Sequence, residues 1–324
     1  DRDRDRTPVF AEPQGKGAPS AILPGVPEVL AFAMGVDPAE LISASIITSD
    51  PLGTGIGNSP LSYFPTEGSE FTILSSGLAS SADAPDNEGS LSYVLDGLNN
   101  VQGNDMVQLF LEIQVPVDRD CLNVDFAFYS EEFPEYVGST FNDTFTAEYG
   151  GSNLIIDGNN VIAPLNFAFD TEGNLISVNT VFGVSANTGT TYDGATPLLR
   201  AKHAVPPGEP ILVVFTVQDL GDSIYDSAVF LDNFHWSNDP VCSSGSQVDI
   251  PWLSVAPTSG SVGAGGNSDI MVSFDASALG VGDYYANLVI GSNDPDENPV
   301  TVPVTLSITA PCYTLTTNVN PSGS

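Results

Sequence analysis

The feature that most constrains the fold is a series of short apolar–polar alternating segments between residues 42 and 237, each bounded by Gly, Pro, Asn or Asp. Alternation with a period of two is typical of half-buried β-strands, and these bounding residues favour turns. One stretch, "PEVLAFAMGVDPAELI", has a helical pattern, and Gly35 and Pro38 keep any helix there short. The sequence therefore predicts an all-β protein.

Changes in composition divide the chain into five segments. We expect a jelly-roll-like β-sandwich over residues 28–238 and a smaller immunoglobulin-like β-sandwich over residues 251–310, where turns recur between short strands. Residues 239–250 are a linker rich in Ser, Gly and Pro. Residues 1–27 are expected to form an extended N-terminal arm, and residues 311–324 a lone C-terminal strand or the start of a further module.

The charge of the chain is strongly negative, because 41 Asp and Glu face 7 Lys and Arg, which gives a formal net charge of -34. Such a surface repels nucleic acid and anionic lipid, so neither is expected as a partner. The sequence has no long apolar run that would insert into a membrane. Two interpretations of the charge remain: solubility through self-repulsion, or partial screening by divalent cations.

Acidic residues gather in "DLGDSIYDSAVFLDNF" (219–234), "SEEFPEY" (130–136) and "FNDTF" (141–145). A Gly-containing loop can direct several carboxylates to one point, and Ca²⁺ binds through six to eight oxygens in irregular geometry. We therefore expect at least one Ca²⁺ to join these loops. The alternative is that these Asp residues bond to backbone N–H groups of nearby turns. The expected ligands are Asp219, Asp222, Asp226, Glu131, Glu132, Asn142 and Asp143.

Three cysteines, Cys121, Cys242 and Cys312, show no CxxC spacing, which argues against a zinc site. Cys121 starts an expected strand and Cys242 follows the end of the same module, so a disulfide between these two is favoured. The scarcity of Lys and the many Thr, Ser, Asn and Gly residues are typical of an exported protein, where disulfides form.

Catalytic patterns are missing from the sequence. Glu131 and Glu132 are adjacent, so on a strand they would point to opposite faces and could not flank one glycosidic bond. The two histidines, His203 and His235, are expected in a loop and on a strand edge. No GxSxG, HExxH or phosphate-binding loop is present. We therefore expect a non-enzymatic protein.

The segments "FAFYSEEFPEYVGSTFNDTF" (126–145) and "DLGDSIYDSAVFLDNF", with "GNSPLSYFPTEGSEFTILSSGLAS", resemble the choice-of-anchor L family of bacterial surface and secreted proteins. The likeness covers about residues 28–238. It implies export and surface display and implies no established activity. The following module, through "WLSVAPTSG" and "GSNDPDENPVTVPVTLSI", resembles the immunoglobulin-like repeats of BACON-like type found beside such domains, which usually act as spacers.

The ends of the chain predict self-association. The arm alternates Asp and Arg, and an unpaired alternating strand tends to add to an open sheet edge. We expect head-to-tail docking on neighbouring copies, which produces filaments when the contacts do not close. The alternative is that both ends fold back on their own subunit. The expected assembly residues are Arg2, Arg4, Arg6, Val9, Phe10, Tyr313 and Leu315.

The sequence thus predicts an extracellular or cell-surface protein that is structural or adhesive, stabilised by calcium, and a subunit of a filament or layer. The alternative is a glycan-binding module of a secreted or cell-surface protein, since sugars stack on exposed aromatic faces. Each candidate aromatic also has an interpretation as a core or edge residue. The candidates are Tyr136, Tyr192, Tyr225, Trp236 and Trp252.

Overall fold

The structure is a computed structural model, and the statements below refer to the residues that it describes. These are residues 22–48, 50–84, 91–95, 104–157, 160–180, 188–239, 242, 246–247, 253–257, 260–263, 266–276, 282–290 and 300–309.

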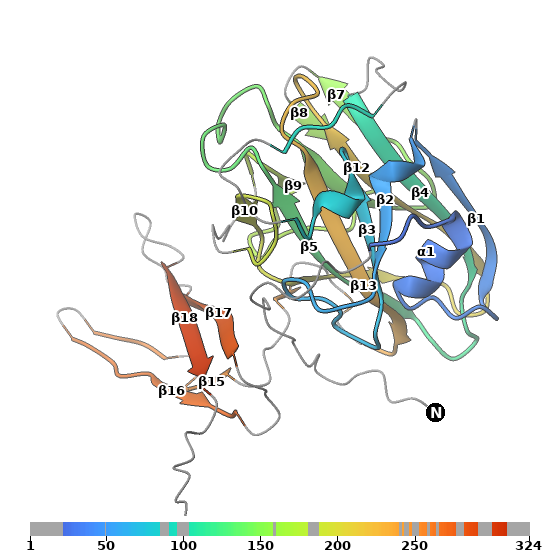
Figure 1. Ribbon diagram of the computed structural model, residues 1–324. Helices are drawn as coiled ribbons and strands as arrows, with labels where there is room; N and C mark the ends of the chain where they lie inside the picture. The colour runs from blue at the N-terminus through green and yellow to red at the C-terminus, as the bar shows by residue number, and fades with distance from the viewer. Residues whose placement is uncertain are drawn as a thin grey trace, which may run out of the picture.

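The expected all-β fold is confirmed, and two antiparallel sheets make up the first module (Figure 1). The first sheet has five strands in the order β1-β4-β12-β6-β9. β4 and β12 form its centre, where long apolar runs allow burial on the face toward the other sheet. The strands are β1 (Leu41–Ile47), β4 (Asn104–Gln114), β6 (Thr144–Tyr149), β9 (Ile176–Ser177) and β12 (Pro210–Asp219).

The second sheet has seven strands, six of them in the order β14-β11-β5-β13-β3-β2, while β10 pairs with β5. β5 and β13 lie at its centre, and all of β5 is buried. The strands are β2 (Thr54–Gly57), β3 (Phe71–Ser75), β5 (Cys121–Ser130), β10 (Gly194–Ala195), β11 (Leu199–Ala204), β13 (Ser227–Ser237) and β14 (Ser246–Gln247).

β13 shows how the sequence fills two cores. Val229 and Leu231 belong to the large core that both sheets share. Ala228 and Phe230 point to the other face, into a second core formed with loop residues such as Phe64. Because successive strand side chains alternate between faces, a strand that is apolar at every position needs a cover on both sides. Loops supply that cover on the outer face.

Helix α1 (Pro27–Ala33) is as short as expected. It starts at Pro27 in the first helical position and is followed by Gly35, whose φ of +107 ends the helix beside β13. A Cβ on Gly35 would come within 3.1 Å of the Phe234 backbone N, so the close approach also requires glycine. Among the described residues no helix is long and apolar enough to cross a membrane.

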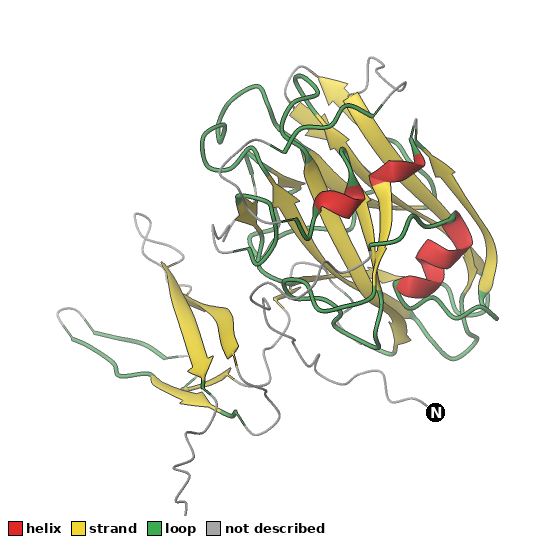
Figure 2. Cartoon of the chain, in the orientation of Figure 1, coloured by secondary structure: helices red, strands yellow, loops and turns green. Residues whose placement is uncertain are grey.

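The remaining elements are short helical turns and hairpins (Figure 2). Ile22 is buried in the second core and Leu23 pairs with Ile56, so these two residues of the expected arm lie on the sandwich. In the second module, β15 pairs with β16 and β17 pairs with β18, and its immunoglobulin-like arrangement stays a prediction. The elements are η1 (Pro51–Gly53), η2 (Ala79–Ser81), β7 (Ile155–Asp157), β8 (Asn160–Ile162), β15 (Leu253–Ala256), β16 (Met271–Phe274), β17 (Gly282–Ile290) and β18 (Val300–Ile308).

Candidate functional site

The first candidate site lies at one end of the sandwich, where several strands end or begin together. The register places Asp219, the last residue of β12, opposite Asn104, the first residue of β4. In the other sheet, β5 ends at Ser130 opposite Ser227, the first residue of β13. The loops at this end bring together carboxylates that are far apart in sequence. We call the following residues the acidic cluster: Asp105, Glu132, Asp143, Asp219 and Asp222.

The carboxylates of the acidic cluster are buried to an unusual degree. Glu132 and Asp143 are 0% exposed and Asp219 is 1% exposed. Asp143 Oδ1 accepts a hydrogen bond of 3.0 Å from the backbone N–H of Leu220. By contrast, both carboxylate oxygens of Glu132 and Oδ1 of Asp219 are buried without a hydrogen-bond partner among the described residues. Buried acceptors of this kind are costly unless something binds them.

The pKa values of the acidic cluster reflect this environment. Burial, with repulsion from neighbouring carboxylates, raises the pKa of Asp219 to about 12 and that of Glu132 to about 9. Burial also raises the pKa of Asp143 to about 7, although hydrogen bonds from Ser227 and Leu220 lower it. In the absence of a cation, the cluster therefore holds protons at neutral pH.

The other three expected ligands have different neighbours. Asp226 receives the backbone N–H of Tyr93 at 3.1 Å on each carboxylate oxygen. Burial raises the pKa of Tyr192, and the negative charge of Glu131 nearby raises the pKa of Tyr192 further. Asn142 Oδ1 accepts from the backbone N–H of Asn179 at 2.9 Å. Asp226 and Asn142 therefore each tie a neighbouring loop in place beside the cluster.

A group of partly exposed aromatic rings lies beside the acidic cluster. Tyr136 and Tyr225 have ring centroids 5.2 Å apart, and Phe141 meets Tyr136 edge-on at 5.4 Å. Phe141 also lies over Gly221, where a Cβ would approach its ring within 2.7 Å. The chain uses Gly221, with φ +112, to let this ring cover the loop that carries Asp222.

In the part of the chain that the structure describes, no three His, Cys, Asp or Glu side chains form a ready-made metal site. The acidic cluster is thus an assembly of electrostatically coupled carboxylates and not a finished coordination shell. The sequence does not single out Asp105, because its position depends on the pairing of β4 with the end of β12. The only local signal was its turn-like neighbourhood, "GND".

The second candidate site is an open cleft of about 1090 Å³. It lies between the end of α1, the loop at 67–70, the loop at 116–119 and the C-terminal end of β13. Its lining residues are Phe32, Ala33, Gly35, Val36, Asp37, Pro38, Glu40, Glu67, Gly68, Ser69, Glu70, Pro116, Asp118, Arg119, Asp232, Asn233, Phe234, Trp236, Ser237 and Asn238.

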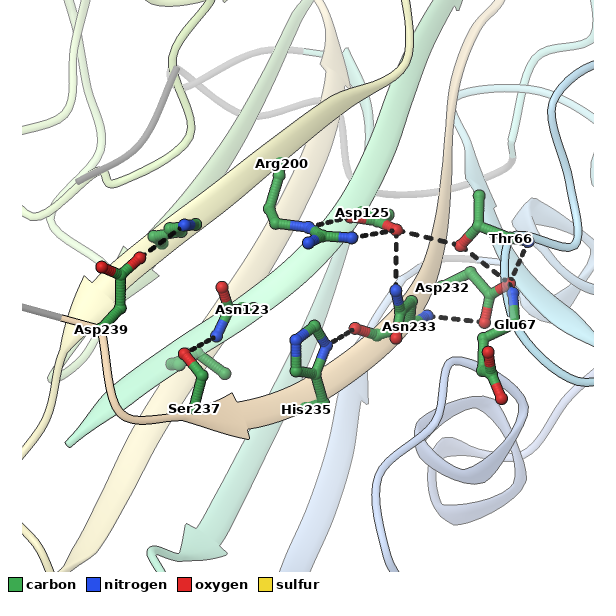
Figure 3. Close-up of polar contacts among 12 residues, drawn as sticks. Thr66, Glu67, Asn123, Asp125, Arg200, Asp232, Asn233, His235, Ser237 and Asp239 are labelled. Carbon is green, nitrogen blue, oxygen red and sulfur yellow. Dashed lines mark hydrogen bonds and ion pairs between the residues drawn. The ribbon is translucent and has the colours of Figure 1, made fainter. Parts of the chain in front are cut away.

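A network of polar side chains supports the floor of the cleft (Figure 3). Arg200 contacts Asp125 through Nε at 2.6 Å and Nη2 at 3.1 Å, which neutralises a carboxylate that is fully buried. Asp125 also accepts from Asn233 Nδ2 at 3.0 Å. Asp232 accepts from the backbone N–H groups of Thr66 at 2.6 Å and Glu67 at 3.0 Å. The network thereby fixes the loop at 66–70 to β13.

The β13 strand is irregular at this point. Its register shifts between Asp232 and His235, and Asn233 has φ +51. A bulge of this kind redirects side chains locally. Burial raises the pKa of Asp232 to about 8, while three backbone hydrogen bonds act to lower it.

Two aromatic residues of the cleft are held in place by neighbours. Trp236 donates from Nε1 to Glu40 Oε2 at 2.8 Å. Its ring meets Phe234 edge-on at a centroid distance of 5.4 Å. A ring that is fixed in this way loses little entropy when a ligand packs against it.

Several sequence expectations about single residues need correction. Tyr192 is 1% exposed in the second core, so it is a core residue and not a sugar-facing one. His235 lies in central strand β13, 3% exposed, and not on a strand edge. His203 lies in β11, where it stacks on Tyr149 at 4.2 Å, and not in a loop. Trp252 falls outside the described residues.

The structure joins Cys121 to Cys242 by a disulfide, with the two Cα atoms 5.8 Å apart and a sequence separation of 121. It links the start of β5 to the segment after β13. Of the expected assembly residues, none lies in the described ranges: Arg2, Arg4, Arg6, Val9, Phe10, Tyr313 and Leu315.

Comparisons with solved structures find distant similarities. Among solved structures, the chain is similar to TmCBM61 in complex with beta-1,4-galactotriose, at 10% identity and TM-score 0.28, over 62% of this chain and 91% of that one. It is also similar to the K1 cleaved adhesin domain of Lys-gingipain from Porphyromonas gingivalis, at 13% identity and TM-score 0.28, over 62% and 94%. Likenesses at this level carry no functional argument. No curated protein matches the chain.

The family model gives the clearer result. Residues 38–235, more than half of the chain, match the choice-of-anchor L domain. This range contains the acidic cluster and twelve of the twenty residues that line the cleft. A domain of this kind suggests a surface or secreted module. The chain therefore belongs to the choice-of-anchor L domain family.

Proposed function

We propose that this chain is an exported surface module with a structural or adhesive role, and that Ca²⁺ bound at the acidic cluster stabilises its first sandwich. The observation that carries the calcium part is the buried carboxylate of Glu132. Within the described part of the chain neither of its oxygens has a hydrogen-bond partner, while Asp143 and Asp219 lie close enough to repel it. One cation there offsets several buried charges at once.

Calcium suits this site better than other common metals. The donors are carboxylates, with no cysteine and no histidine in the cluster, and hard oxygen donors select Ca²⁺ or Mg²⁺. Ca²⁺ tolerates irregular geometry, whereas Mg²⁺ requires a near-ideal octahedron. The proposed ligands are Glu132, Asp143 and Asp219, with Asp222 at the partly exposed side. These side chains have to draw together as the ion binds, because they do not form a finished shell beforehand.

Calorimetry on EDTA-stripped protein tests the calcium part. We expect heat on addition of Ca²⁺ to the wild type and none with Glu132→Gln, which keeps the shape of the side chain and removes its charge. Glu172→Gln is the matched control, because Glu172 is exposed on a turn and does not belong to the acidic cluster. Absence of heat on adding Ca²⁺ to the wild type would contradict the proposed calcium site.

The assembly part of the proposal concerns the terminal segments, where the alternation of Asp and Arg at residues 1–6 and the strand pattern after Pro311 support docking on a neighbouring copy. Negative-stain microscopy of the full chain is expected to show head-to-tail polymers. Chains lacking residues 1–15 or 312–324 are expected to remain single. Normal polymers from both truncated chains would contradict self-association through the ends.

The second candidate function is glycan binding, and the open cleft beside α1 favours it. The cleft combines aromatic and polar side chains, as ligand sites commonly do. A glycan array with the full chain distinguishes this candidate from a purely structural role, since a spacer binds none of the immobilised sugars.

A further inference from the structure

We propose that the cleft between α1, the loop at 67–70 and the β13 bulge binds a neutral saccharide. This inference deepens the glycan-binding candidate above, on which it rests, by naming its site and the class of sugar. It does not depend on calcium, because the cleft and the acidic cluster share no residue.

The first support is a buried acceptor that lines the cleft without a partner. Asn233 is 2% exposed, and its Nδ2 is committed to Asp125. Its Oδ1 has no hydrogen-bond partner among the described residues. A buried carbonyl oxygen of this kind costs about 1–3 kcal/mol unless a donor reaches it. Sugar hydroxyl groups are donors of suitable size, and Asn233, at the bulge of β13, is among the residues that line the cleft.

The second support is that two aromatic side chains, Phe32 and Trp236, line the cleft. Phe32, on α1, is 39% exposed and lines the cleft. Trp236 also lines the cleft, and its ring is fixed by a hydrogen bond to Glu40 and an edge-on contact with Phe234. Apolar C–H faces of a sugar ring pack well on rigid aromatic rings, while the ring hydroxyls reach polar groups at the side.

The third support is the charge of the lining, which selects the class of sugar. Six carboxylic acids line the cleft, and Arg119, the one cation there, is paired with Asp118 at 2.9 Å. Uronate, sulfate or sialic acid groups would be repelled. Carboxylates instead accept hydrogen bonds from vicinal hydroxyls. The six acids are Asp37, Glu40, Glu67, Glu70, Asp118 and Asp232.

The size of the cleft fits an oligosaccharide. Small-molecule sites usually measure about 300–1,000 Å³, and this cleft has about 1090 Å³ and is open to solvent. An open groove of that volume accommodates more than one sugar ring and leaves the ends of a chain free. We therefore expect recognition of an internal part of a polysaccharide.

The test begins with the full chain on an array of neutral gluco-, galacto- and manno-oligosaccharides together with uronate, sulfated and sialylated glycans. The neutral sugar that binds is then measured by calorimetry in Ca²⁺ and in EDTA. We expect binding to neutral glycans alone, with similar affinity in both buffers. Binding restricted to anionic glycans would overturn the class of ligand.

Two variants on the same helix locate the site. Phe32→Ala is expected to weaken binding about tenfold, corresponding to about 1.4 kcal/mol. Val29→Ala, which removes another exposed apolar side chain of α1 outside the cleft, is expected to leave affinity unchanged. Trp236→Phe, which keeps a ring but loses the bond to Glu40, is expected to weaken binding and to abolish the change in tryptophan emission on adding sugar.

The outcomes separate this inference from the broader candidate. Neutral glycans bound equally well by wild type, Phe32→Ala and Trp236→Phe would overturn the cleft while keeping glycan binding elsewhere. No binding to any glycan would overturn both. A synthetic peptide of residues 1–10 that binds the cleft, where no sugar does, would replace the saccharide by the N-terminal segment of the chain. Circular dichroism on each variant ensures that lost binding does not reflect unfolding.

Discussion

The carboxylate of Asp226 lies directly over Gly77, so that a Cβ on Gly77 would come within 1.8 Å of Asp226 Oδ2. The same carboxylate receives the backbone N–H of Tyr93. Asp226 therefore joins two loops to the start of β13, and glycine at position 77 is what allows the buried carboxylate to fit. An acidic residue that seemed a metal ligand from its spacing has a clear structural role.

The contact between Gly77 and Asp226 predicts a strong effect of one methyl group. Gly77→Ala is expected to lower the free energy of unfolding by about 1–3 kcal/mol, because the carboxylate must leave its place against Tyr93 N–H. Urea unfolding measures the change. Gly260→Ala, where a Cβ meets nothing within 4 Å, is the control and is expected to have little effect. Equal stability of the two variants would argue against the close packing.

Removal of the disulfide is expected to lower the free energy of unfolding by as much as Gly77→Ala does, or by more. Cys121 and Cys242 close a long loop, and the loss of a native disulfide typically costs about 2–5 kcal/mol. The variant Cys121→Ser with Cys242→Ser is compared with Cys312→Ser in urea unfolding. Peptide mapping without reducing agent is expected to find Cys121 joined to Cys242. A map with Cys312 in place of either partner would contradict the pairing.

The acidic cluster predicts a pH dependence with a definite sign. The folded pKa values of Asp143 and Glu132, about 7 and about 9, lie above the values near 4 in an unfolded chain. The folded protein without calcium therefore binds more protons than the unfolded chain. This contribution to stability is fully present below about pH 4 and is lost as the pH rises through about 7 and about 9.

Urea midpoints in EDTA at pH 5, 7 and 9 measure this dependence. We expect a fall in stability on the order of 1 kcal/mol or more for each raised group between pH 5 and pH 9. Asp226 and Asp232, whose pKa values burial raises to about 7 and about 8, act in the same direction. Ca²⁺ is expected to reduce this fall in stability, because the bound cation neutralises the carboxylates that lose their protons as the pH rises. A midpoint in EDTA that rises from pH 5 to pH 9 would contradict the account.

Much of the fold was predictable from local pattern. The alternation in β13 placed Val229 and Leu231 on one face and Ala228 and Phe230 on the other, and the two cores confirm this. Period-two alternation is a local property that the backbone of a strand imposes, so one sequence reveals it. The short helix near Leu30 followed from Pro27, Gly35 and Pro38 in the same local way.

The sites depended on contacts that no local pattern specifies. Asp105 joins the acidic cluster because β4 begins where β12 ends, which is a matter of strand order. The cleft draws its lining from four stretches of the chain, and its floor needs the bulge at Asn233. His235 was misplaced for the same reason, since its burial depends on β13 having a neighbour on each side. Asp219 and Asp226 are buried, which their spacing in the sequence does not reveal, while Asp222 is partly exposed.

The most direct test of the calcium site compares thermal unfolding in EDTA and in excess Ca²⁺ for the wild type and Glu132→Gln. At a Ca²⁺ concentration about 100 times Kd, the wild type is expected to gain about 2.7 kcal/mol, a shift of several degrees in Tm. Glu132→Gln is expected to exceed the wild type in EDTA, because Gln is neutral and, unlike Glu132, needs no proton in order to be buried, and to gain nothing from Ca²⁺. A wild-type Tm that is the same in EDTA and Ca²⁺, or a variant that responds to Ca²⁺ as the wild type does, would contradict the central claim.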